Sequence, residues 1–518
     1  MARFLGLRGT RLSVMAIIGV LMPGIITVGY NTASLGGVLS LHSFNTTFPQ
    51  IDVHHAKDKD SASSLEGTAV AAFAIGSFLG TFACIWLGDW LGRRRTIMLG
   101  ATTQIIGYIL STSSFSLVQL IAARIIVGMG TGTLLATIPL WISETSPAKQ
   151  RGSHVVTKGI FTGVGCATAL FLEFGMSFKS HTTLAWRLPF AFPTILSFSV
   201  LCFILLLPES PRWLIQKDRI PEARYILAAL ADTYVEDESI EATVSEVQAS
   251  LSLTGGNKAF KELFQMGPQR TFHRASLAVG GMLFLQFTGA TVTTFYTTAI
   301  FESNLDLAQS TARLLAAVYQ LAGPLGAILC VFLIEGVGRR RLMMCSALGN
   351  MICLACIAGL GSQVEDIKAC HAAVFFLFLF HFCYIIGFGG IPYLYATEVA
   401  PLHLRATINS VSISVGGAVG ILIAHVTPLA FNKMGEKYFF VFAGLNAIIV
   451  PSVYFLFPET SGRTLEEIDD IFTLSDGVLD TVRVARTLPC LPAHGEIESP
   501  IESNPKFQTI LKEREFTV

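Results

Sequence analysis

The sequence predicts an all-α polytopic membrane protein with twelve transmembrane helices arranged as two six-helix pseudo-repeats. Composition supports this class, because 52% of the 518 residues are hydrophobic and only 14% are charged. Soluble domains carry about 25% charged residues. Three charged motifs also occur twice along the chain, which indicates that one ancestral unit was duplicated. Two homologous membrane halves facing one another are typical of transporters.

The duplicated motifs lie at the edges of apolar stretches and are separated by nearly constant distances. Glu144 and Glu398 are 254 residues apart, and Glu209 and Glu459 are 250 residues apart. The three pairs are Gly88–Arg95 with Glu335–Arg341, Glu144–Arg151 with Glu398–Arg405, and Pro208–Arg212 with Pro458–Arg463.

Apolar stretches of about 20 residues, long enough to cross a bilayer, define the expected spans. They are residues 14–38, 66–87, 96–114, 118–142, 154–176, 188–207, 275–299, 311–334, 342–360, 371–396, 407–431 and 438–457. The expected domains are an N-terminus, an N-terminal half, a linker with short helices, a C-terminal half, and a tail mostly disordered after about residue 475. Their bounds are 1–13, 14–207, 208–274, 275–457 and 458–518.

Basic residues are concentrated on one side of the expected spans, including the arginine triplets that begin at Arg93 and Arg339. The positive-inside rule therefore places the N-terminus, linker and tail in the cytosol. We expect an integral protein of the plasma membrane. The sequon at Asn45 then falls in an external loop, where glycosylation is possible.

The sequence offers no signature of an enzyme, a metal site or a cofactor. The net charge is zero, which gives no indication of nucleic-acid binding, and no obligate protein partner is evident. Most of the ten cysteines lie in apolar runs, where they behave as small hydrophobic residues. The Cys353–Cys356 pair lacks a nearby second pair of ligands, so a zinc or redox role is not expected.

The motifs together resemble those of the sugar porter family of the major facilitator superfamily. The sequence, including Phe4–Gly9 (FLGLRG) near the N-terminus, is similar to that of fungal members. The most specific are Gly88–Arg95 (GDWLGRRR), Pro208–Leu214 (PESPRWL) and Pro458–Glu467 (PETSGRTLEE). The resemblance covers roughly residues 12–470. It implies a six-plus-six bundle, a central site for a small molecule between the halves, and alternating access.

The resemblance also implies ion pairs at the cytosolic ends of both halves. They act as a latch when the cytosolic side closes; the alternative is that the arginines only hold the loops inside. The expected participants are Asp89, Arg93, Glu144, Arg151, Glu209, Arg212, Glu335, Arg339, Glu398, Arg405, Glu459 and Arg463.

The first span departs from the pattern of proton-coupled relatives. They carry an aspartate after Gly-Tyr, whereas this chain has Asn31 after Gly29-Tyr30, and it retains the usual span-4 partner, Arg124. Because asparagine cannot exchange a proton, we expect facilitated diffusion. The alternative is that Asn31 only joins helices by hydrogen bonds, which is equally compatible with a uniporter.

Several positions that bind sugar in the family have lost their polar side chains, and glycines occupy most of them, including Gly159 and Gly323. We expect the site to be larger and less polar than a hexose site, suited to a disaccharide, a polyol or another metabolite. The candidate substrate-contacting or cavity residues are Asn31, Gln286, Thr291, Phe295, Tyr296, Tyr384 and Tyr393. For Phe295 and Tyr296, packing along span 7 is an equal alternative.

Three functions remain open on this basis. The first is a facilitative transporter of a sugar or polyol. The second is a carrier or exporter of a non-sugar secondary metabolite on the same fold. The third, a sugar sensor that does not transport, is disfavoured because its signalling tail would be longer.

Overall fold

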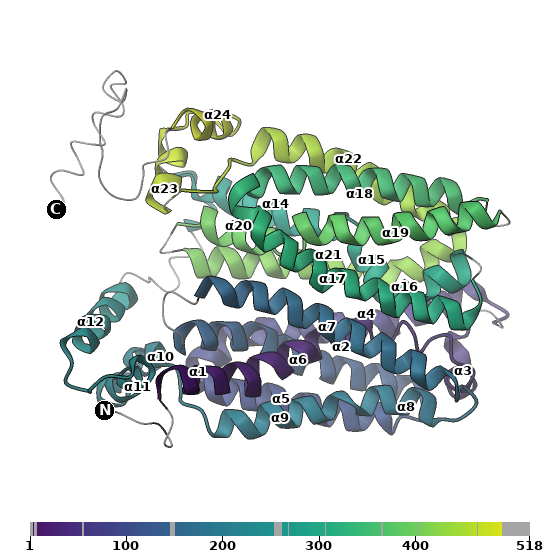
Figure 1. Cartoon of the computed structure of the whole chain (residues 1–518), viewed down its shortest axis with the longest axis horizontal. Helices are drawn as coiled ribbons and strands as arrows, with labels where there is room; N and C mark the ends of the chain where they lie inside the picture. Colours follow the sequence, from purple (N-terminus) through teal and green to yellow (C-terminus); the bar gives the residue numbers. More distant parts are fainter. Residues whose placement is uncertain are drawn as a thin grey trace.

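The computed structural model describes the chain from Phe4 to Leu488 with short gaps. The described residues are 4, 8–53, 56–145, 151–252, 262–267, 269–305, 307–363, 366–401, 404–463 and 465–488. The molecule is an elongated helical bundle, and the first and last labelled helices, α1 Gly9–Ala16 and α24 Asp480–Thr487, lie at the same end of it (Figure 1). We call this the terminal end and the other the opposite end.

Each expected span of the N-terminal half is helical over most of its length. The helices are α1 Gly9–Ala16, η1 Ile17–Leu21 and α2 Met22–Ala33 for the first span, α4 Lys59–Leu91, α5 Arg93–Thr112, α6 Leu117–Thr145, α7 Arg151–Ser177, and α8 Leu184–Ala191 with α9 Pro193–Leu205 for the sixth. Two short helices, α3 His42–Thr47 and η2 Pro49–Ile51, follow the first span at the opposite end.

The C-terminal half repeats this plan, with breaks in its first and fourth spans. Gly289, with φ of +90°, separates two segments of span 7, and Gly389 and Gly390 interrupt span 10. Its helices are α14 Thr271–Phe287, α15 Ala290–Phe295, α16 Thr297–Ala299, η4 Ile300–Asn304, α17 Gln309–Val337, α18 Arg339–Gly361, α19 Ile367–Gly387, α20 Ile391–Val399, α21 Arg405–Met434, η5 Gly435–Lys437 and α22 Tyr438–Leu456.

Length and composition support membrane insertion directly. Nine helical stretches within the described residues are apolar and long enough to cross a bilayer, and the last, Thr407–Leu456, contains both α21 and α22. The protein is therefore an integral multi-pass membrane protein of the predicted fold class.

Small residues allow neighbouring helices to approach closely. A Cβ built on Gly76 of α4 would lie 2.1 Å from the carbonyl oxygen of Ile125 in α6, and one built on Gly128 would lie 2.2 Å from that of Phe73. Helices in lipid associate through such contacts, because apolar side chains gain little by leaving lipid tails.

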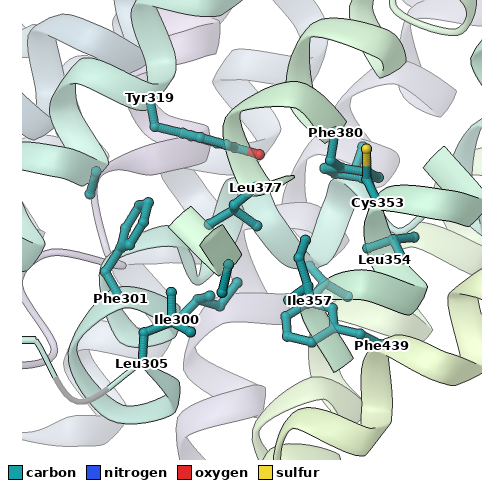
Figure 2. Close-up of a cluster of buried hydrophobic side chains, with 14 of the residues drawn as sticks. Ile300, Phe301, Leu305, Tyr319, Cys353, Leu354, Ile357, Leu377, Phe380 and Phe439 are labelled. Atoms are coloured by element: carbon teal, nitrogen blue, oxygen red, sulfur yellow. The ribbon is translucent and has the colours of Figure 1, made fainter. Parts of the chain in front are cut away.

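The two halves pack through two helix pairs. Helix α7 lies beside α17, and α4 lies beside α21. At the second pair, a Cβ built on Gly67 would lie 2.1 Å from the carbonyl oxygen of His425. One apolar cluster spans both halves, from Tyr30 and Leu170 to the side chains of α17, α18 and α19 shown in Figure 2.

Short helices cover the terminal end (Figure 1). The linker forms α10 Pro211–Gln216, α11 Ile220–Ala231 and α12 Glu238–Ser252, as expected for short surface helices. The tail forms α23 Leu465–Leu474 and α24 Asp480–Thr487. Helix α24 lies in the part of the tail after residue 475, and Arg463 holds it by donating to the carbonyl oxygens of Ala485 and Leu488. Residues 489–518 lie outside the described residues.

Candidate functional site

The first duplicated motif forms a charged cluster at the terminal end of the N-terminal half. The Arg93 guanidinium binds both oxygens of Glu144, at 3.1 and 3.3 Å, and donates to Asp89 at 3.3 Å. The side chains of Arg93 and Glu144 are only 10% and 7% exposed. A bidentate pair with this burial joins the end of α6 to the start of α5.

The C-terminal half contains the equivalent cluster. Arg339 donates to Glu398 at 2.9 Å and to Glu335 at 2.9 and 3.0 Å. Glu398 also accepts a hydrogen bond of 2.7 Å from the hydroxyl of Thr460. Sequence duplication has thus preserved one arrangement of carboxylates around one arginine in both halves.

Glu209 and Glu459 have a different role from the ion pairs expected for them. Glu209 accepts hydrogen bonds of 3.0 Å from the backbone N–H groups of Arg93 and Arg94, and Glu459 accepts those of Arg339 and Arg340 at 2.8 and 3.2 Å. These N–H groups begin α5 and α18 and have no partner within their helices. The carboxylates therefore cap helix N-termini, where negative charge is also favoured by the helix dipole.

The other expected members of the clusters contribute less. Arg212 is exposed, and no ion pair shown between the described residues includes it. Arg463 departs from the prediction, because it holds α24 through backbone carbonyls instead of a carboxylate. Arg405 begins α21 at the same end of the bundle. The side chain of Arg151 lies outside the described residues.

A glycine precedes each central arginine and makes the cap possible. Gly92 and Gly338 have φ of +87° and +94°, and a Cβ on either would lie 2.6 Å from the capping carboxylate. We expect Gly338→Ala to destabilise the C-terminal half by about 1–3 kcal/mol, because it combines backbone strain with loss of the cap. Thermal unfolding of purified protein in detergent measures this, with Gly336→Ala, which has open space around it, as the control. Equal unfolding temperatures for the two variants would contradict this account.

The structure places Asn31 within the N-terminal half, bonded to protein groups. Its Nδ2 donates to the Tyr108 hydroxyl at 2.6 Å and to Thr131 Oγ1 at 3.2 Å, and the residue is 1% exposed. It therefore joins α2 to α5 and α6, as the alternative interpretation held.

Arg124 is also fully buried, at 1% exposure. Its Nη1 donates to the Ser34 hydroxyl at 3.3 Å, and its guanidinium lies 5.0 Å from the centre of the Phe73 ring. Two further nitrogens, Nε and Nη2, have no hydrogen-bond partner. The ring supplies part of the stabilisation that a carboxylate supplies in an ion pair.

The remaining candidate residues divide between two places. Gln286 and Thr291 flank the break in span 7 and are hydrogen-bonded to each other at 2.6 Å, and Tyr384 and Tyr393 are half-buried in α19 and α20. Phe295 and Tyr296 are buried nearer the opposite end, in a cluster that contains side chains of both halves, and the Tyr296 hydroxyl donates to Ala424 O at 2.8 Å. Their placement is that of packed residues that close this end.

Polar contacts between the halves also occur at the opposite end. The Arg313 guanidinium donates to the carbonyl oxygen and hydroxyl of Ser40, at 3.0 and 2.9 Å. Asp60 accepts from Asn432 at 2.9 Å and pairs with Lys433 at 3.3 Å. Each charged cluster of the terminal end lies within its own half, whereas these contacts at the opposite end join the two halves.

The family model for "Sugar (and other) transporter" matches residues 14–472, which include both halves and both clusters. The chain belongs to the sugar porter family of the major facilitator superfamily. It is therefore a membrane transporter of small molecules and not an enzyme.

Relatives and solved structures agree with this assignment. The chain is 30% identical over 522 residues to the "Sugar transporter STL1" of Saccharomyces cerevisiae, covering 99% of this chain and 90% of that protein. It is 31% identical to the "MFS-type transporter oryC" of Aspergillus oryzae, covering 88% and 84%. The xylose transporter XylE of Escherichia coli, in a partially occluded inward-open conformation, has the same fold, with a TM-score of 0.71, 18% identity, and coverage of 88% and 98%.

Proposed function

We propose that this family member is a facilitative carrier of a neutral sugar or polyol that works by alternating access. One observation carries the facilitative mode: the amide of Asn31 occupies the place of a proton-binding carboxylate and is bonded to Tyr108 and Thr131. Arg124 accordingly makes no ion pair within the described part of the chain. The similarity to a yeast protein named as a sugar transporter supports the substrate class.

The orientation follows from charge. The terminal end contains both arginine clusters, so the positive-inside rule places it, with both chain ends, in the cytosol. The opposite end, with Asn45 half-buried in α3, is then external. We place the protein in the plasma membrane on the same reasoning, with Asn45 as a glycosylation acceptor.

The clusters support a modified form of the expected latch. Because the ion pairs shown for Arg93 and Arg339 stay within their own halves, they brace each half as a rigid body. Alternating access then depends on contacts between halves, such as those of Arg313 and Asp60, which break when the external end opens.

A second candidate, a carrier of a non-sugar metabolite, is favoured by the loss of polar lining. A Cβ on Gly159 or Gly417 would have ample room, with the nearest atoms 3.7 Å away. Amides at such positions would offer hydrogen bonds to sugar hydroxyls, and glycines do not. This candidate predicts transport of a less polar substrate with the same conformational cycle.

Uptake in cells that lack their own sugar carriers tests the proposal. We expect concentration-driven uptake of at least one labelled hexose, pentose or polyol, with a rate that is insensitive to a protonophore and nearly constant between pH 5 and 7.5. The control is the same cell line without the carrier, measured under the same conditions. Uptake of no sugar or polyol would favour the metabolite carrier, and uptake abolished by the protonophore would contradict the uniporter.

If uptake did prove proton-dependent, Glu173 of α7 is the residue to test next. Its carboxylate is 2% exposed, has no hydrogen bond of normal geometry, and interacts electrostatically with Arg313 and Arg124. Glu173→Gln would then remove the dependence.

A further inference from the structure

A buried histidine interrupts a phenylalanine-rich run in helix α19. His381 follows a run of α19 that reads Val-Phe-Phe-Leu-Phe-Leu-Phe from Val374 to Phe380, and Phe382 comes next. The residue is only 4% exposed, and its Nδ1 has no hydrogen-bond partner among the residues that the structure describes. A phenylalanine would fill this space without burying an unpaired polar atom, so packing alone does not explain the histidine.

A second unsatisfied polar group lies against the imidazole. The ring centres of His381 and Tyr319 are 4.3 Å apart, with 41° between the planes, and the Tyr384 ring centre is 6.3 Å from that of His381. Tyr319 is fully buried, and its hydroxyl faces Thr293 without a hydrogen bond of normal geometry. Figure 2 shows its side chain extending from α17 toward Leu377 and Phe380 of α19.

The imidazole lies where the two halves meet. A Cβ built on Gly323 of α17 would be 3.4 Å from Nε2 of His381 and 3.9 Å from the Cα of Gly163, which belongs to α7 of the other half. The resemblance to the family implies a polar side chain at the position of Gly323. In helix α17 it is about 14 residues from the opposite end, which places it near the middle of the bilayer.

The chemistry of this group restricts what it can bind. A neutral imidazole has one donor and one acceptor, and a tyrosine hydroxyl has the same pair, so both match the hydroxyl groups of a polyol. The aromatic rings of Tyr319 and Tyr384 lie against the imidazole, and no ion pair shown between the described residues includes His381. A charged ligand would therefore lack a counter-charge at this position.

We propose that His381, assisted by Tyr319, is a specificity-determining residue that hydrogen-bonds a hydroxyl of a neutral polyhydroxy substrate at the interface between the halves. The proposal rests on the proposed function and adds a binding group to it. The imidazole supplies on α19 the polar contact that Gly323 no longer supplies on α17.

The first test separates binding from turnover. We expect His381→Phe, which preserves ring size, to raise KM about five- to tenfold with little change in the maximal rate, since one hydrogen bond to a neutral group is lost. His381→Gln should recover most of the affinity. His371→Gln, on an exposed position of the same helix, is the control and should leave KM unchanged.

Deoxy analogues of the transported substrate identify the contact. In the parent protein, one analogue should bind more weakly than the substrate, because it lacks the hydroxyl that His381 contacts. In His381→Phe, this analogue and the substrate should bind with equal affinity, because the variant cannot form that hydrogen bond with either. If every analogue loses the same affinity in both proteins, His381 makes no substrate contact and the proposal is wrong.

A second test does not depend on knowing the substrate. A cysteine introduced by His381→Cys should react with a small, membrane-impermeant thiol reagent from the cytosolic side, with the modified peptide identified by mass spectrometry. Labelling without uptake of any sugar or polyol would overturn the sugar assignment while supporting the site. Absence of labelling from either side would overturn the site, whatever the uptake results.

Discussion

Replacing Arg93 with alanine is expected to lower the stability of the N-terminal half by about 3–5 kcal/mol, because the buried carboxylate of Glu144 loses its partner. Glu144 is 7% exposed, and within the described part of the chain this guanidinium supplies both of the hydrogen bonds that it accepts. Leaving a charge buried without compensation costs more than the pair contributes when intact. Thermal unfolding in detergent and the yield of monodisperse protein measure the effect.

The neighbouring arginines provide the controls for this experiment. Arg95 is exposed, so Arg95→Ala should change the unfolding free energy by no more than about 0.5 kcal/mol. Combining Arg93→Ala with Glu144→Gln should recover part of the lost stability, because no buried charge then remains. An Arg93→Ala protein as stable as Arg95→Ala would show that the cluster does not brace this half.

The duplicated motifs carried enough information to predict the fold, and the reason is physical. Helices in a bilayer must satisfy their own backbone groups, so apolar length alone locates them. The spacing of Glu144 and Glu398 then identified two equivalent halves. The match over residues 14–472 and the XylE-like fold confirm both inferences.

The roles of individual side chains were harder to predict, because they depend on orientation within each helix. Glu209 and Glu459 are acidic residues in motifs rich in arginine, which suggested ion pairs. In the structure their carboxylates instead accept hydrogen bonds from backbone N–H groups at the starts of α5 and α18. Arg463 lies in a duplicated motif but donates to backbone carbonyls of α24 and the residue after it, and the eight residues of this helix are too few to show a clear periodicity.

His381 was missed for a related reason. A single histidine in an apolar helix does not define a polar face. The sequence therefore could not show whether His381 faces the lipid or the other half of the protein. The signal that could have identified it is the polar interruption of a phenylalanine run, together with Gly323, where the resemblance to the family implies a polar residue. Only the packing of α17 against α7 brings these observations together.

Arg313→Ala is expected to open the end of the bundle that we place outside. Arg313 is 5% exposed, donates twice to Ser40 of the other half, and interacts electrostatically with the buried Glu173. Its removal costs two charge-assisted hydrogen bonds that exist only when this end is closed. If the closed conformation is destabilised by about 1.4 kcal/mol or more, the equilibrium constant for opening rises at least tenfold. The population of the open conformation rises by the same factor as long as it is a minor population.

An introduced cysteine at Phe295 reports this opening. The residue is 9% exposed, and a Cβ on Gly36 of the N-terminal half would lie 2.4 Å from its carbonyl oxygen, so the closed conformation shields it. Labelling of Phe295→Cys by an external, membrane-impermeant thiol reagent should therefore accelerate about tenfold when Arg313→Ala is added. Lys433→Ala is the matched control, because its pair with Asp60 is more than half exposed and contributes below about 1 kcal/mol. If both substitutions accelerate labelling equally, closure depends on general packing at this end, and the Arg313–Ser40 contact does not set the balance between the two conformations.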